Sequence, residues 1–462
     1  MQKTNNTFLE GPILPSLLRF AMPVLLALFL QALYGAVDLW AVGRFCGSAD
    51  VSAVATGSQT MLIVTGAITG LSMGATILLG QRFGEKDYKS AANVIGTSIW
   101  IFAGLGIILT IVMVIAAPMI TILMHAPAEA LDKTVHYIRI CGAGILFIVG
   151  YNAMSSIFRG MGNSKAPLLF VTIACIVNVI GDIVLIRIFD MGTAGVALAT
   201  VSAQAVSVVL SLVLVKREGL PFPFTKENMR FDKGTAKRLV KLGSPIALQD
   251  MCNEMSYLIL IGLVNTLGVI TSAGVGIAER LVMFILLIPM SYMSSISAFA
   301  AQNAGAGQKE RAKKSMWLGM LTAVLLGGIM SYLSFYHGDM LSSIFIKEPV
   351  VIKASSEFLK ATAIECFILS IAYCFTGYYN GLGKTSFVMA QGLCAIFLVR
   401  IPYAYFASRK PDPSLFQIGM SAAVAAAFTL LACAFYYVRE NVKDKHEIIL
   451  NKEKLNNEGL PK

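Results

Sequence analysis

Acidic residues placed inside apolar stretches are the chemical feature that sets this sequence apart. Six carboxylates and two arginines lie well within such stretches: Asp38, Asp182, Asp250, Glu254, Glu279 and Glu365, with Arg280 and Arg400. An ionisable side chain is costly to bury there and marks function by default. A buried carboxylate can take up a proton, help to hold a small cation or attract a positively charged compound.

Five polar residues of the first half have spacings that favour a common pocket. Gln31 and Asp38 are seven residues apart, which is two helical turns on one face. Asn178 and Asp182 are four apart on another helix, and Thr200 lies early in the next apolar run. If these faces meet, they form a cation-coupling site for a proton, or for sodium at Asp38 and Asp182. The alternative is that Asn178 and Thr200 only join helices, a contact worth about 1 kcal/mol.

A second pair of acids lies one helical turn apart. Asp250 and Glu254 are predicted to face the same side of their helix, where they form a candidate substrate site or a second cation site, with sodium as one candidate ion. The alternative reading places Asp250 near the cytoplasmic rim of the membrane, where water would simply hydrate it.

Two further acids are assigned to the same substrate or second cation site. Glu279 and Arg280 are adjacent, so their side chains point about 100° apart on a helix and each needs another partner. Glu365 is predicted to neutralise Arg400, which lies at a similar depth on the next apolar segment.

The elements that carry these residues belong in a membrane. Of the 462 residues, 56% are hydrophobic and 14% are charged, whereas soluble domains have about 25% charged residues. A bilayer core of about 30 Å needs about 20 apolar residues per helix. This window predicts twelve spans near residues 17–42, 52–79, 94–117, 138–158, 166–187, 194–215, 240–264, 271–299, 316–336, 359–380, 386–407 and 415–438.

Composition and motifs exclude several other classes of protein. The net charge is +11, but the basic residues interrupt apolar runs and form no stripe, so nucleic acid is not expected as a partner. The eight cysteines form no CxxC pair and the four histidines share no metal-binding spacing, so no cofactor is expected. Gly381-Leu-Gly-Lys-Thr385 lacks the first glycine of a phosphate-binding loop, because position 378 is tyrosine. With no HExxH motif or nucleophile elbow, the chain is predicted not to be an enzyme.

The distribution of lysine and arginine predicts the orientation. The side that would hold both termini carries 26 of these residues outside the spans, and the opposite side carries nine. The chain is expected in the plasma membrane. Because positive residues concentrate on the cytoplasmic side of membrane proteins, both termini are expected in the cytoplasm.

The chain also repeats itself. Gln81-Arg-Phe-Gly84 returns as Gln302-Asn-Ala-Gly305, and Arg159-Gly-Met-Gly162 returns as Asn380-Gly-Leu-Gly383, both 221 residues later. This spacing predicts an all-α polytopic protein of two six-helix lobes, related by a pseudo-twofold axis along the membrane normal. The expected domains are a first lobe at 1–215, a cytoplasmic linker at 216–239, a second lobe at 240–438 and a polar cytoplasmic tail at 439–462. No buried acid has an acidic counterpart in the other half, so the scaffold was duplicated and the chemistry was not.

From Gly11 to about Arg439, the sequence resembles the multidrug and toxic compound extrusion (MATE) transporters of bacteria. The resemblance lies in Gly11-Pro12 with Pro23, Gln31-Ala-Leu-Tyr-Gly-Ala-Val-Asp38, Gly74, Gln81-Arg-Phe-Gly84, Phe158-Arg-Gly-Met-Gly-Asn-Ser-Lys-Ala-Pro167, Asn178-Val-Ile-Gly-Asp182 and Gly195-Val-Ala-Leu-Ala-Thr200.

This resemblance implies secondary antiport, in which a cationic or amphipathic compound leaves as protons or sodium enter. It also implies roles in cation coupling for Asp38, Asn178, Asp182 and Thr200. Two positions depart from the family pattern: Ile183 stands where many members have proline, and Asn253 stands where several have glutamate. The expected partners are small cationic substrates and membrane lipid, and a monomer is expected. A lipid-linked oligosaccharide flippase of the same superfamily is the alternative function, although it would favour a cationic cavity.

Overall fold

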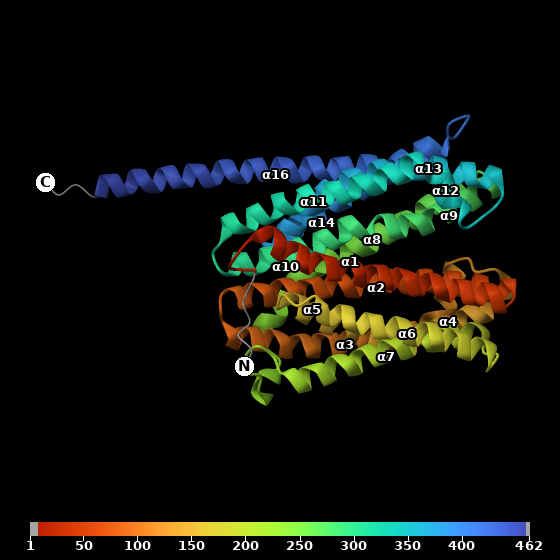
Figure 1. Ribbon diagram of the computed structural model, residues 1–462, viewed down its shortest axis with the longest axis horizontal. Coiled ribbons are helices and arrows are strands. Elements are labelled where there is room, and N and C mark those ends of the chain that lie inside the picture. Colours follow the sequence, from red (N-terminus) through yellow and green to blue (C-terminus); the bar gives the residue numbers. More distant parts are fainter. Residues whose placement is uncertain (1–7, 459–462) are drawn as a thin grey trace.

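Two bundles of helices, one from each half of the chain, lie against each other along their length (Figure 1). The computed structural model describes residues 8–458, with side chains over 8–225 and 227–443. The first half contains α1 (Ile13–Phe45), α2 (Ser48–Gly84), α3 (Tyr88–Leu123), η1 (Ala128–Ala130), α4 (Leu131–Ala143), α5 (Ile145–Gly160), α6 (Lys165–Arg187) and α7 (Gly192–Glu218).

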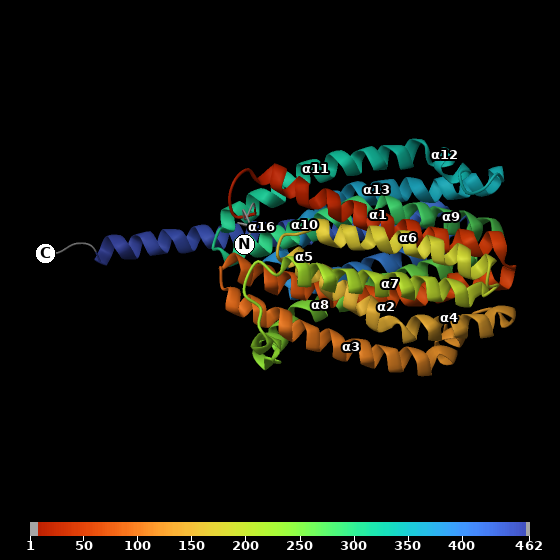
Figure 2. The same cartoon turned by 60° about the horizontal axis from the view of Figure 1, so that its bottom comes forward.

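The second half repeats this order with more interruptions. After the short turn η2 (Lys226–Met229) it contains α8 (Lys233–Asn265), α9 (Val269–Ile285), α10 (Leu287–Gly305), α11 (Lys309–Tyr336), α12 (Gly338–Ser343), α13 (Pro349–Gly381), α14 (Thr385–Cys394), the π-helical turn η3 (Ala395–Arg400), α15 (Ile401–Ser408) and α16 (Leu415–Glu458). The helices run nearly parallel between the two ends of the bundle (Figure 2). The all-helical, polytopic fold that the sequence predicts is therefore confirmed.

Ten helical segments of the described chain are long and apolar enough to cross a membrane. An eleventh is the bent pair α4 and α5. Helix α8 does not meet the same criterion, because its middle carries the polar residues Gln249, Asp250, Asn253 and Glu254. The outer faces are apolar: Ile115 and Met119 of α3 are 73% and 74% exposed. Such a surface is suited to contact with lipid chains.

Breaks in three spans were not visible to a hydropathy window. The α4–α5 pair bends by 48° at Gly144, where an added Cβ would lie 2.3 Å from the side chain of Val201. The span formed by α9 and α10 is interrupted at Leu286. In the third, Pro402 cannot donate a hydrogen bond four residues back, and the turn before it widens into the π-helical η3.

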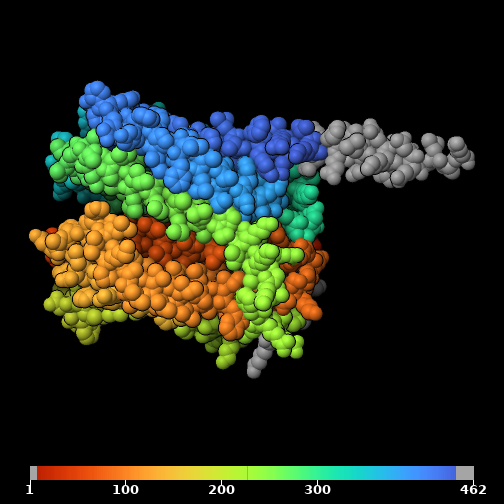
Figure 3. Space-filling model, turned by 180° about the vertical axis from the view of Figure 1, so that it is seen from behind, coloured from red at the N-terminus to blue at the C-terminus, as the bar shows by residue number. Residues whose placement is uncertain are grey.

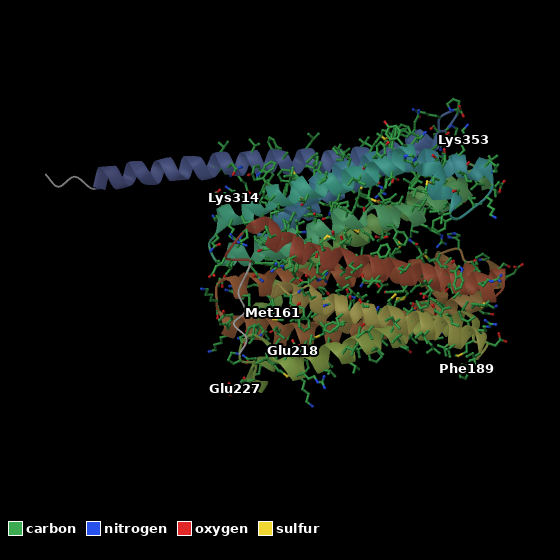
Figure 4. The ribbon with its side chains drawn as sticks, viewed as in Figure 1. Met161, Phe189, Glu218, Glu227, Lys314 and Lys353 are labelled. Carbon is green, nitrogen blue, oxygen red and sulfur yellow. The ribbon has the colours of Figure 1, made fainter. Side chains whose placement is uncertain are left out.

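One end of the bundle holds the connection between the halves and is called here the linker end. It carries Met161, Glu218, Glu227 and Lys314, whereas Phe189 and Lys353 mark the opposite, far end (Figure 4). Helices α7 and α8 both extend into the expected linker 216–239, which leaves only 219–232 outside them, and α16 continues through the expected tail as far as Glu458.

Asp232 caps the start of α8 by accepting a hydrogen bond from the Thr235 backbone N–H at 2.6 Å. Because this bond favours the ionised carboxylate, it holds the pKa of Asp232 below its ordinary value.

Glycines let the two halves approach each other at backbone distance. Along α2 and α8, a Cβ added to Gly70 would lie 2.5 Å from the Ala247 backbone, and one added to Gly74 would lie 2.6 Å from the Gly243 backbone. Helices approach this closely only where side chains are absent. Helix α2 of the first half is therefore fixed against α8 of the second.

The repeated glutamine–glycine motif forms a reciprocal contact at the linker end. Gln81 of α2 donates to the Gly381 carbonyl at 3.0 Å, and Gln302 of α10 donates to the Gly160 carbonyl at 2.8 Å. Each glutamine therefore reaches across to the glycine motif of the other half. A Cβ added to Gly84 would lie 1.9 Å from the Gln302 carbonyl oxygen, and one added to Gly305 would lie 2.0 Å from that of Gln81. These contacts, called here the linker-end seam, close the halves together.

A groove runs between the halves on the face shown in Figure 3. The N-terminal part of the chain, coloured red, lies recessed in the floor of this groove. It lies between α8 and α9 on one side and α3 and α4 on the other, as the colours show. The two halves are therefore in contact at the linker end and are separated by the groove along one face.

Alanine at the seam glycines is expected to destabilise the protein. The variants Gly84→Ala and Gly305→Ala should each lose about 1–3 kcal/mol, because the new methyl group must displace a backbone carbonyl. The readout is the Tm of detergent-solubilised protein. The matched control is Gly104→Ala in α3, where nothing lies within 4 Å of the added Cβ and a slight gain is expected. A Tm for Gly84→Ala equal to that of Gly104→Ala would contradict the backbone contact.

Candidate functional site

Helices α1, α6 and α7 bring four of the five predicted coupling residues into one cluster. Asn178 donates to the Thr200 hydroxyl at 3.4 Å, and that hydroxyl donates to Oδ2 of Asp38 at 3.3 Å. The carboxyl of Asp182 lies next to that of Asp38. Asp38, Asn178 and Asp182 are all buried. This group is called here the first-half cluster.

The first-half cluster has more acceptors than donors. Oδ1 of Asp38, both carboxyl oxygens of Asp182 and Oδ1 of Asn178 have no hydrogen-bond partner within the described part of the chain. Buried oxygens without donors are unfavourable unless a proton or a cation satisfies them. Carboxylate, amide and hydroxyl oxygens are also the ligands that hard cations such as sodium prefer. The arrangement can therefore bind a proton or a small cation.

Gln31 lies outside this cluster. Its side-chain amide donates to the hydroxyl of Tyr151 on α5 at 3.2 Å, two turns along α1 from Asp38. The sequence reasoning also missed Gln204, which donates to the hydroxyl of Tyr34 at 3.4 Å. The helical period could have indicated Gln204 and Tyr34, since Gln204 is four residues after Thr200 and Tyr34 is four residues before Asp38. Their aromatic and amide groups extend the polar wall beside the cluster.

Asp250 and Glu254 lie at mid-depth between the two halves. A Cβ added to Gly66, in the middle of α2, would lie 4.0 Å from Cβ of Asp250 and 3.9 Å from Cγ of Glu254. Both acids are half-buried and interact electrostatically. The alternative that Asp250 lies at the rim of the membrane is therefore wrong, because its neighbour Gly66 is equally far from both ends of α2.

Arg400 is the centre of the second-half site. It is 4% exposed, and its Nη1 donates to Oδ1 of Asn253 and to Oγ of Ser256, both at 3.1 Å. The guanidinium stacks on the ring of Tyr257, 3.5 Å from its centroid, and the Tyr257 hydroxyl donates to Oε1 of Glu365 at 3.3 Å. Glu365 and Arg400 interact electrostatically, as the sequence predicts, but these two described residues form no direct ion pair, because Tyr257 contacts both groups.

The remaining charged residues differ in their surroundings. Glu279 of α9 interacts electrostatically with Arg400 and Glu254 as well as with its neighbour Arg280. Arg280 itself is exposed. Glu254, Glu279 and Glu365 thus share the field of a single buried arginine, a group called here the Arg400 cluster. The residues missed by sequence reasoning were Tyr257 and Ser256, one turn beyond Asn253 and Glu254.

Comparison with known proteins recovers the two halves of the chain. The MatE family model matches residues 23–184 and again residues 245–406, which together make up most of the chain. The chain belongs to the MatE family. The two matches are displaced by 222 residues, close to the spacing of the repeated motifs. Members of this family are transporters, and the prediction that the chain is not an enzyme is confirmed.

Two relatives show how far the likeness to MATE proteins extends. The chain is 27% identical over 433 residues to the probable multidrug resistance protein YpnP of Bacillus subtilis, with 94% of this chain and 96% of the relative covered. It is 22% identical over 407 residues to the multidrug export protein MepA of Staphylococcus aureus, with 86% and 89% covered.

Solved structures share the fold. A multidrug resistance MATE family transporter of the MOP superfamily, solved in an outward-facing conformation, superposes with a TM-score of 0.90 at 17% identity, covering 96% of this chain and 99% of the other. A MOP superfamily transporter from Pyrococcus furiosus, described as having a binding pocket of reversed polarity, superposes with a TM-score of 0.88 at 18% identity, covering 94% and 98%. At these identities the likeness concerns the fold alone.

Neutralising one acid of the first-half cluster is expected to stabilise the protein. Asp182→Asn removes one of two adjacent buried carboxyls and should raise the Tm by a few degrees, since about 1 kcal/mol corresponds to roughly 2–4 °C in domains of 150–250 residues. The measurement is thermal unfolding at neutral pH without sodium.

The control for this prediction is Asp50→Asn at the far end. Asp50 forms an ion pair with Lys133 at 2.6 Å, so its neutralisation should leave the Tm unchanged or lower. If Asp182→Asn lowered the Tm more than Asp50→Asn, the unpartnered oxygens of Asp182 would instead have a structural partner.

Proposed function

We propose that this MATE protein is a secondary antiporter, which exports cationic or amphipathic small molecules in exchange for protons or sodium ions. The observation that supports this most strongly is the first-half cluster, where acceptor oxygens of Asp38, Asn178 and Asp182 converge without donors in the described chain. The names of the relatives YpnP and MepA, which concern multidrug resistance and export, support the substrate class.

The proposed cycle is an exchange by competition. A proton or sodium ion enters the first-half cluster while the groove faces outward, and this changes the packing of α1, which contacts both α6 of its own half and α10 of the other. Pro23 lies inside α1 and removes one helical hydrogen bond, so α1 has a point at which it can bend. Movement of α1 then expels the substrate held between the halves.

The orientation follows from the same proposal. The linker end carries the excess of lysine and arginine, so we place it and both termini in the cytoplasm of a cell bounded by this membrane. The linker-end seam then closes the cytoplasmic side, and the groove opens outward. Lipid surrounds a monomer, since one chain contains both halves and both clusters.

The substrate is proposed to bind near the second-half acids Asp250, Glu254, Glu279 and Glu365. Asp250 and Glu254 lie between the halves against α2, where a cleft that alternates its opening would hold its cargo. The excess of acids over Arg400 there favours a positively charged compound. The same excess speaks against a lipid-linked oligosaccharide flippase, whose anionic substrate would need a cationic cavity.

The energetics limit what such an exchanger can do. One proton exchanged for one monovalent cation moves no net charge, so only the pH gradient drives the exchange, at about 1.4 kcal/mol or tenfold accumulation per pH unit. Larger accumulation requires more protons per cycle or a neutral substrate.

Antiport is tested by the efflux of a cationic dye from proteoliposomes under an imposed pH gradient and then under a sodium gradient. We expect one gradient to drive efflux and Asp38→Asn to reduce it at least tenfold, because an amide neither takes up a proton at neutral pH nor carries the charge that binds sodium. The matched control is Asp412→Asn, an exposed acid near the far end, which should export at the wild-type rate.

Two results would contradict the proposal in different ways. If neither gradient moves any of several cationic dyes, export of cations is wrong. If Asp38→Asn exports normally, the coupling site lies elsewhere, and Glu254→Gln and Glu279→Gln would be measured in the same assay.

A further inference from the structure

The side edge of the Arg400 guanidinium is a donor pair with no acceptor. Nη1 is occupied by Asn253 and Ser256, but Nε and Nη2 have no hydrogen-bond partner among the residues described. Arg400 is almost fully buried, with 4% of its surface exposed. A buried cation with two unused donors is unfavourable unless something satisfies them during the working cycle.

These two donors have a geometry that selects their partner. Nε–H and one N–H of Nη2 lie in the guanidinium plane along the same edge and point in parallel, which matches the two oxygens of a carboxylate. A single carbonyl or hydroxyl oxygen would fill only one of them. The free edge therefore favours a carboxylate over a neutral acceptor.

The chain directs its own nearest carboxylate elsewhere. Glu365 accepts from the hydroxyl of Tyr257, whose ring covers one face of the guanidinium. Within the described chain Arg400 has no ion pair at 4 Å or less, although it lies in the field of Glu254, Glu279 and Glu365. Asn253 and Ser256 hold Nη1, so the guanidinium is fixed by α8 while Nε and Nη2 have no hydrogen-bond partner among the described residues.

We infer that the free edge of Arg400 binds the carboxylate of a zwitterionic substrate whose cationic group is held by Glu254 and Glu279. This inference rests on the proposed export function and narrows its substrate class to compounds that carry one carboxylate and one amine-derived cation. The π-helical η3 places Arg400 at the site, and the two glutamates nearby supply the opposite charge that the cationic group needs.

The experiment compares two dyes that differ only at the carboxyl group. Rhodamine B carries a free carboxylate and a delocalised cation, and its ethyl ester keeps only the cation. Binding of each dye to the purified full chain is measured by fluorescence anisotropy, and efflux of each from proteoliposomes is measured under the gradient that drives transport.

Arg400→Lys keeps the charge and loses the paired donors, so the Kd for rhodamine B should rise about tenfold while the Kd for the ester stays unchanged. Arg400→Gln removes the charge, so it should weaken rhodamine B further and leave the ester bound as tightly or more tightly. Because the ester reports on folding and on the rest of the site in the same variant, a misfolded protein would lose both dyes. The control is Arg280→Lys, an exposed arginine in α9, which should leave the ratio of the two Kd values unchanged.

Equal effects of Arg400→Lys on both dyes would overturn the inference and assign Arg400 a structural role. Wild-type protein that exports the ester but neither binds nor exports rhodamine B would also overturn it, and the proposed export function would stand. Wild-type protein that exports neither dye would overturn both.

Discussion

Backbone contact between the halves is the constraint on which the rest of the structure depends. Gly74 of α2 meets Gly243 of α8, and Gly84 meets the Gln302 carbonyl of α10, at distances that any side chain would prevent. Because α2 is thereby fixed to the second half, its middle is brought against Asp250 and Glu254. In this structure the halves part along the groove, and α1 contacts α6 of its own half and α10 of the other half. A movement of α1 therefore changes the interface between the halves while the contact between α2 and α8 stays in place.

The two halves share a scaffold and differ in where that scaffold is interrupted. Glu365 occupies the position that Gly144 holds in the first half, and Gly144 is where α4 and α5 bend. The first half bends at this position and the second half runs straight through it, with Glu365 buried in a continuous α13. Conversely, the π-helical turn that ends at Arg400 corresponds to an uninterrupted stretch of α6. Duplication supplied the helices, and local irregularity placed different charged groups on them.

The sequence predicts the twelve spans and four members of the first-half cluster, because hydropathy and the helical period both act within a single segment. Asp38 and Asp182 stand out as carboxylates inside apolar spans, Asn178 by its spacing from Asp182, and Thr200 by its place at the start of the next span, and the family resemblance indicates the same four residues. Contacts between segments could not be predicted in the same way. The partner of Gln31 is a tyrosine 120 positions along the chain, and no spacing within one helix indicates it.

The second half shows the same limit more sharply. Depth along the span correctly suggested that Glu365 and Arg400 lie near each other, but the intervening Tyr257 belongs to a third helix, α8.

The two clusters lack opposite kinds of hydrogen-bonding partner. In the described chain, the first has acceptor oxygens without donors and the second has guanidinium donors without acceptors. A small cation satisfies the first and a carboxylate satisfies the second, so ligands of different kinds can bind the two halves without competing for the same atoms. If the protein exchanges ion for substrate as proposed, their competition acts through the interface, where α1 and α2 contact both halves.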